Sequence, residues 1–173
     1  MHPVEIRDAL DSMVLLVDTR EQDTPALRKR LEASGRPFER ATLKSGDYSA
    51  RFILPDGSSC SLADRVVVER KMSAGEISQN FTRNRDRFIR EFERLKAAGT
   101  RSHLIIENSS WEDIAGHNYR TLFAPRAFIA SLMAWQARYD VRIHFCRPET
   151  TGWLIERILY YELKEMLESG AFG

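Results

Sequence analysis

Short apolar runs alternate with amphipathic stretches along the chain. The apolar runs are rich in β-branched residues, which is typical of strands that are buried in a sheet. They predict strands at residues 13–17, 38–43, 48–54, 66–68, 103–107 and 141–146. The β-rich part from Phe38 to Val68 is expected to form a central antiparallel hairpin or meander.

Between these strands, apolar residues recur at helical spacing. The longest such stretch, from about Glu76 to Ala98, carries aromatic residues along one side and is expected to form one continuous helix. Other helices are expected from Pro25 to about Gly35, from near Trp111, over 125–139 and over 153–168. Strands that alternate with helices predict a three-layer α/β/α fold around a central mixed β-sheet.

The composition fits a single globular domain over residues 1–173, with 43% hydrophobic and 29% charged residues. No apolar run is long enough to cross a bilayer, and Met1 to Ser12 lacks the apolar stretch of a signal peptide. We therefore expect an intracellular, cytoplasmic protein with no membrane contact. Its formal net charge is only +1, so any affinity for nucleic acid must come from local clusters of charge.

Acidic residues stand at the ends of the predicted strands. Asp18 ends the first apolar run, Asp47 follows Gly46 at the start of another strand, and Glu69 directly follows Val-Val-Val. Open α/β sheets place ligand sites at such strand ends, so we expect the three carboxylates to share one site. They offer hard oxygen ligands without thiolate or imidazole, which favours Mg²⁺, with Mn²⁺ as a substitute.

Lys71 lies two residues beyond Glu69 and is expected on the same face of the strand, with Arg70 on the other face. An ammonium group beside a metal could orient the attacking water or stabilise a pentavalent transition state. The alternative is that these residues are turn residues and solvent-exposed strand ends. Their position at the mouths of apolar strands favours a functional site.

Three motifs occur in order along the chain: Val17-Asp18-Thr19-Arg20-Glu21, Gly46-Asp47-Tyr48 and Val68-Glu69-Arg70-Lys71. Together they resemble the signatures of the XPF-type (ERCC4-like) nuclease domain, which belongs to the PD-(D/E)XK superfamily. The similarity extends over about residues 14–166. It implies a restriction-endonuclease-like fold and a metal-dependent endonuclease that cuts branched, flap or junction DNA.

The resemblance also implies residue roles. Asp47 and Glu69 would bind the metal, Asp18 would be a ligand or support one, and Lys71 would be the catalytic lysine. Glu21 and Arg70 also match motif positions, so both are candidate catalytic residues. Glu21 can equally be a first-turn helix acid. For Arg70, a structural or DNA-facing role is expected, because alternation turns its side chain away from the metal.

One departure from the family pattern concerns the residues after Lys71. The family usually carries Asp after three further residues, whereas this chain has Gly75 in that place and Glu76 next to it. Either Glu76 replaces that acid after a slip of one residue, or the support is missing.

Arginines recur at helical spacing in the stretch after Glu76, and we expect them to contact DNA phosphates. One of them, Arg83, falls where the family carries a basic residue near the mouth of the active site. The alternative is a solvated helix face that neighbouring acids brace. The predicted DNA contacts are Arg83, Arg87 and Arg90, with Arg94 completing the row.

The last two predicted helices are apolar over a wide arc, which indicates either core packing or contact with another chain. The resemblance implies that the chain forms a homodimer through this C-terminal region. Two further functions stay open: a catalytically silent DNA-binding or dimerisation partner, and a less structure-selective, restriction-like nuclease. The presence of Asp47, Glu69 and Lys71 together favours an active enzyme.

Overall fold

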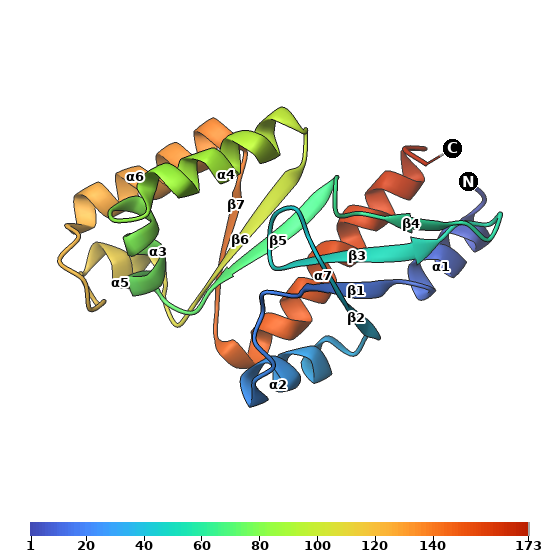
Figure 1. Cartoon of the computed structure of the whole chain (residues 1–173), viewed down its shortest axis with the longest axis horizontal. Helices are drawn as coiled ribbons and strands as arrows, with labels where there is room; N and C mark the ends of the chain where they lie inside the picture. Colours follow the sequence, from blue (N-terminus) through green and yellow to red (C-terminus); the bar gives the residue numbers. More distant parts are fainter. Residues whose placement is uncertain (173) are drawn as a thin grey trace.

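Seven strands form one mixed sheet in the computed structural model of the chain, which describes residues 1–172. The strand order is β2-β1-β3-β5-β6-β7, and β4 pairs with β3 (Figure 1). The strands are β1 (Val14–Asp18), β2 (Phe38–Ala41), β3 (Tyr48–Ile53), β4 (Ser59–Ser61), β5 (Val66–Lys71), β6 (Arg101–Glu107) and β7 (Arg142–Cys146).

The antiparallel part of the sheet is smaller than the sequence suggested. β3 is antiparallel to β1, β4 and β5, but β2 pairs in parallel with β1 at the edge of the sheet. The expected central meander is therefore wrong for β2. The reason lies in α2, which connects β1 to β2 as a crossover helix, and such a connection brings two strands together in parallel.

Helices cover both faces of the sheet. Helices α1, α2 and α7 pack on one face around Leu27, Tyr48 and Leu159, and α3 to α6 pack on the other around Phe88, Leu104 and Trp135. The helices are α1 (Pro3–Asp11), α2 (Pro25–Ser34), α3 (Ala74–Phe81), α4 (Arg85–Ala97), α5 (Trp111–Ala115), α6 (Pro125–Tyr139) and α7 (Pro148–Glu168). These layers confirm the predicted α/β/α fold. None of the helices within residues 1–172 has the length and apolarity needed to span a bilayer.

The stretch expected as one helix from Glu76 to Ala98 is two helices. The Thr82 hydroxyl donates to the Ser78 carbonyl at 3.0 Å, and the Asn84 N–H bonds the Gln79 carbonyl instead of continuing the regular ladder. A hydroxyl that bonds the backbone competes with the helix, so α3 ends and α4 starts again after Asn84. Arg83 lies in this break.

Helix α7 approaches α2 closely at Gly152. A Cβ at this position would lie 1.9 Å from the Arg30 carbonyl oxygen, so only glycine permits the contact. This contact helps to bring α2 and α7 together over the same face of the sheet, where Arg30 is buried.

Candidate active site

A tight turn places Asp47 at the start of β3. Gly46 has φ +76°, and a Cβ there would lie 2.7 Å from Val67 Cβ, so the turn requires glycine. The Asp47 N–H donates to the Val68 carbonyl at 2.9 Å, and the Asp47 carbonyl accepts from the Asp18 N–H at 2.9 Å. The backbone of Asp47 is thereby fixed between β1 and β5.

Asp47, Glu69 and Lys71 line one cavity of about 360 Å³. The Arg70 N–H donates to Asp47 Oδ2 at 2.8 Å, and Lys71 Nζ lies 2.6 Å from Glu69 Oε1. The structure therefore brings together the two acids and the lysine that the sequence singled out.

Burial and the charge of Glu69 raise the pKa of Asp47 well above its usual range, against the hydrogen bond from Arg70. Burial also raises the pKa of Glu69, although Lys71 opposes this. Burial works to lower the pKa of Lys71, but the charge of Glu69 and its hydrogen bond outweigh it and leave that pKa raised. The ammonium is thus kept charged beside two acids that it does not fully compensate.

Glu76 contributes a further acid to this cavity from the first turn of α3. Its carboxylate accepts the Met72 N–H at 2.7 Å, while the Ser73 hydroxyl accepts the Glu76 N–H at 3.1 Å. Glu76 therefore lies beside the site, in the first turn of the helix that Ser73 caps.

A rim of cations surrounds the acids, and the sequence analysis gave two of them, Arg20 and Lys44, no role in binding DNA. Arg20 and Lys44 lie on one side, and Arg87 and Arg94 lie on α4. Arg20 belongs to the Asp-Thr-Arg-Glu motif, which could have indicated that it lies at the site. No sequence feature placed Lys44 at the site, and none placed the remaining lining residues there: Asn80, Asn84, Phe88 and Glu91.

Asp18 is fully buried and does not line the cavity. Its Oδ1 accepts from the Arg20 N–H at 2.9 Å and from Arg20 Nε at 2.5 Å, and its Oδ2 accepts from the Leu43 N–H at 2.8 Å. Of the two roles expected for Asp18, ligand and support, these contacts fit support. Asp18 holds Arg20 at the rim and fixes the segment before Asp47.

Arg70 points to the opposite face of the sheet, as the alternation of side chains predicts. Its guanidinium binds the Glu107 carboxylate through two hydrogen bonds, of 2.8 and 2.6 Å, and Thr151 donates to Glu107 at 2.6 Å. Although burial works to raise the pKa of Glu107, the bonds from Arg70 and Thr151 leave it below the ordinary value.

Glu21 also lies outside the cavity lining. Its carboxylate accepts from the Tyr48 hydroxyl at 3.0 Å, and that hydroxyl accepts from Arg30 Nη1 at 2.8 Å. Tyr48 neighbours Asp47 in sequence, so Glu21 is placed to support the site from behind. Neither Glu21 nor Arg70 has a side-chain contact with Asp47 or Glu69 among the hydrogen bonds and ion pairs of residues 1–172.

The expected row of DNA-binding arginines is divided by the break between α3 and α4. Arg87 and Arg94 line the cavity, Arg90 is exposed outside its lining, and Arg83 lines a different cavity. The expectation that Arg83 lies at the mouth of this site is therefore wrong, because the break turns it elsewhere. None of the four forms an ion pair within residues 1–172, so the acid bracing considered as an alternative is not seen.

The donor set can be compared with what a metal requires. No three His, Cys, Asp or Glu side chains within the described residues converge into a ready metal cluster. Mg²⁺ is usually held by one or two carboxylates, water and substrate phosphate rather than by a complete protein cage. Asp47 and Glu69, both with raised pKa and all-oxygen donors, fit this mode of binding.

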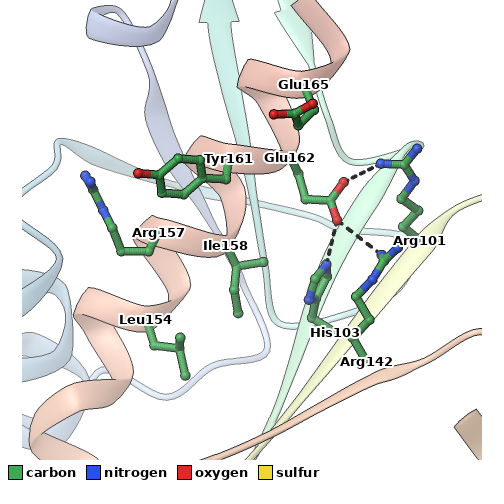
Figure 2. A pocket seen from close by; sticks show the side chains of 9 residues that line it. All are labelled: Arg101, His103, Arg142, Leu154, Arg157, Ile158, Tyr161, Glu162 and Glu165. Atoms are coloured by element: carbon green, nitrogen blue, oxygen red, sulfur yellow. Dashed lines mark hydrogen bonds and ion pairs between the residues drawn. The ribbon is translucent and has the colours of Figure 1, made fainter. Parts of the chain in front are cut away.

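A second cavity, of about 460 Å³, lies between α7 and the β6–β7 edge (Figure 2). One of its two acids, Glu162, bonds His103 at 3.0 Å, Arg101 at 2.6 Å and Arg142 at 3.2 Å. Burial works to raise the pKa of Glu162, but these partners lower it to about 2. The Glu162 carboxylate is paired with three partners here, unlike Asp47. A second acid, Glu165, also lines this cavity.

The family model for the ERCC4 domain matches residues 17–156. Among solved structures, the chain resembles XPF from Aeropyrum pernix and the complex of that protein with DNA. The TM-score is 0.62 for both, the identities are 22% and 23%, and the match covers 86% and 88% of this chain. It covers 61% and 66% of the XPF chains, so this chain spans less than two thirds of their length.

No curated protein sequence matches the chain. The structural likeness confirms the fold, and the family match includes all three motifs with Asp18, Asp47, Glu69 and Lys71. With most of its sequence matched by the family model, the chain belongs to the ERCC4 domain family.

Proposed function

We propose that the chain is a Mg²⁺-dependent endonuclease that hydrolyses phosphodiester bonds in DNA, at branched, flap or junction structures. The observation that carries the proposal is the cavity shared by Asp47, Glu69 and Lys71. Its acids are partly buried and only partly compensated, and a divalent cation would relieve their repulsion.

Asp47 and Glu69 are the residues that would hold the metal. When bound there, Mg²⁺ would supply a Lewis acid that polarises a phosphate oxygen and offsets the charge of the leaving oxygen. Lys71 remains protonated, since its pKa is raised, and can donate a hydrogen bond to a non-bridging phosphate oxygen or to the attacking water. Asp47 is kept in place by the Arg70 N–H.

DNA is proposed as the substrate because cations surround the acids. Arg20, Lys44, Arg87 and Arg94 stand at the same cavity, where they can neutralise phosphates on either side of the cleaved bond. Arg20 is bound to Asp18, yet 64% of its side chain is exposed. Likeness to an XPF structure in complex with DNA supports this choice of substrate.

Cleavage of labelled flap, fork, four-way-junction and linear duplex DNA in Mg²⁺ tests the proposal, with Asp47→Ala as the paired variant. We expect the wild type to cut branched substrates and Asp47→Ala to be inactive. Equal cutting by both proteins would place the active site elsewhere. Cutting of linear duplex as fast as flaps would favour a restriction-like nuclease, and no cutting by the wild type would favour a silent partner.

A homodimer through the C-terminal helices is part of the proposal. Met133 on α6 and Trp153 and Tyr161 on α7 are each about half exposed, whereas Leu132 and Trp135 are buried in the core. Exposed aromatic side chains of this kind are typical of protein interfaces. Size-exclusion chromatography with light scattering should give twice the chain mass for the wild type and a monomer for Trp153→Glu with Tyr161→Glu. A wild-type monomer at micromolar concentration would contradict the dimer.

A further inference from the structure

Three cavities follow one another around helix α3 and share lining residues. The first is the candidate active site, to which Glu76 contributes. The second, of about 490 Å³, also contains Glu76 and extends to Thr121. The third, of about 580 Å³, shares Gln79, Arg120 and Thr121 with the second. We call the second and third cavities together the α3 groove, and it leads directly away from the carboxylates.

The far wall of the α3 groove is the loop between α5 and α6, and this loop is held in place. The Thr121 and Ser78 hydroxyls are hydrogen-bonded at 2.8 Å, and the Thr121 carbonyl lies 2.9 Å from His117 Nε2. The Tyr119 hydroxyl donates to the Phe123 carbonyl. Between these anchored residues, Leu122 is 97% exposed. Its apolar side chain is therefore presented to solvent by a fixed loop.

The charge of the α3 groove is positive at its outer end. Arg83 and Arg120 line the third cavity, and no acidic side chain lines it. Neither arginine forms an ion pair in the part of the chain that the structure describes. The break after Phe81 is what places Arg83 here, since it lies between the two helices.

Two free guanidinium groups beside an exposed apolar side chain fit a ligand with repeated phosphates and accessible apolar rings. A single strand of nucleic acid has both, because its bases are not covered by pairing. A blunt duplex offers phosphates but keeps its bases stacked inside, so Leu122 would gain little from it. The observations therefore favour an unpaired strand over a duplex.

We propose that the α3 groove binds an unpaired strand of the DNA substrate beyond the point of cleavage, with Arg83 and Arg120 on phosphates and Leu122 against a base. This inference rests on the proposed function, because it places the strand in continuity with the active-site cavity. It also gives Arg83 a role away from the active-site mouth.

Fluorescence anisotropy in EDTA tests the groove without cleavage, with labelled oligothymidine and a blunt duplex as probes. The double variant Arg83→Ala with Arg120→Ala should bind oligothymidine about tenfold more weakly, and its salt slope should be smaller by about 1.4, at about 0.7 for each lost phosphate contact. Its binding to the blunt duplex should be unchanged. Arg7→Ala is the matched control, because Arg7 is exposed on α1 at the other end of the molecule (Figure 1).

Leu122→Ser separates the apolar contact from the charges. It should weaken the binding of oligothymidine severalfold without changing the salt slope, because it removes no phosphate contact. Unchanged binding of oligothymidine by the double variant, or an equal loss for the blunt duplex, would overturn the proposal. Thermal unfolding of each variant, expected to match the wild type, excludes misfolding as the cause.

Cleavage of a fork in Mg²⁺, measured separately, keeps the two proposals distinguishable. A wild type that binds oligothymidine through Arg83 and Arg120 but cuts nothing would refute the nuclease proposal and leave the groove intact. If the double variant cuts forks as fast as the wild type and binds oligothymidine equally well, the proposal for the α3 groove is refuted and the nuclease proposal stands.

Discussion

Neighbouring residues of β5 place their charges in two contrasting environments. On the face toward α4, Glu69 and Lys71 share a cavity with Asp47, and the pKa values of both acids are raised, first by burial. On the face toward α7, Arg70 binds Glu107 through two hydrogen bonds, and the pKa of Glu107 lies below its ordinary value. A fully paired buried acid such as Glu107 therefore stabilises the fold, whereas an incompletely paired acid such as Asp47 remains available for a ligand.

The contrast is sharpest in a variant that removes the Asp47 charge. Asp47→Asn should lower cleavage roughly a thousandfold or more, because it removes the charge of a proposed metal ligand. The same variant should unfold at a temperature equal to or above that of the wild type, because it removes a partly buried charge that Glu69 repels, and Asn can still accept the Arg70 N–H. Single-turnover cleavage and thermal unfolding measure the two effects.

A clear drop in the unfolding temperature of Asp47→Asn would mean that Asp47 stabilises the fold. The acids on the two faces of β5 would then have the same role.

The opposite face should respond in the opposite way. Glu107→Ala leaves Arg70 without its partner in a buried setting and should destabilise the protein by roughly 3–5 kcal/mol. Urea unfolding measures this loss. Asp23→Ala is the control, because its ion pair with Arg28 is exposed on both sides and should contribute little. Equal midpoints for the two variants would show that the Arg70–Glu107 pair does not stabilise the fold.

The turn that joins the two faces can be disturbed at Gly46. Gly46→Ala should destabilise the protein by roughly 2–4 kcal/mol, since it combines an unfavourable positive φ with a clash against Val67. Gly57→Ala is the matched control: Gly57 also has a positive φ, +83°, but nothing lies within 4 Å of its added Cβ. Gly57→Ala should lower the free energy of unfolding by roughly 1–2 kcal/mol. Chemical unfolding of both variants compares them, and a smaller loss at position 46 would contradict the predicted clash.

The smallest effect concerns the stacked pair of His103 and His144 at the β6–β7 edge. Burial and the neighbouring His103 and Arg142 lower the pKa of His144 to about 4, from an ordinary value of 6.5. The unfolded chain therefore binds this proton at a higher pH than the folded chain. Stability should fall by roughly 2–3 kcal/mol as the pH decreases from 6.5 toward 4. His144→Gln should flatten this part of the curve of unfolding free energy against pH, and an unchanged slope would contradict the assignment.

The fold followed largely from the sequence because its buried strands are continuous apolar runs, as at Val66–Val68. Alternation along β5 also separated Glu69 and Lys71 from Arg70 correctly. Helix α1 was missed because only Ala9 and Leu10 of it are buried, and β4 because a three-residue strand carries no periodic signal.

The positions of Asp18 and Arg83 could not be predicted, because they depend on contacts that no local sequence pattern encodes. Asp18 stands at a strand end like the other acids, yet its oxygens are taken by Arg20 and the Leu43 N–H. The break after Phe81 results from a hydroxyl that bonds a carbonyl four residues back, and it sends Arg83 to another surface. Pairing between distant segments therefore decides which charged residues remain free.

Titration of Mg²⁺ into the metal-free protein, followed by calorimetry, tests the central claim most directly. The wild type and Glu107→Gln should both bind the ion, because Glu107 lies on the far face, whereas Asp47→Asn should lose most of the binding. Binding that is the same in wild type and Asp47→Asn would contradict the assignment of the metal to this cavity, and so would a loss of binding confined to Glu107→Gln.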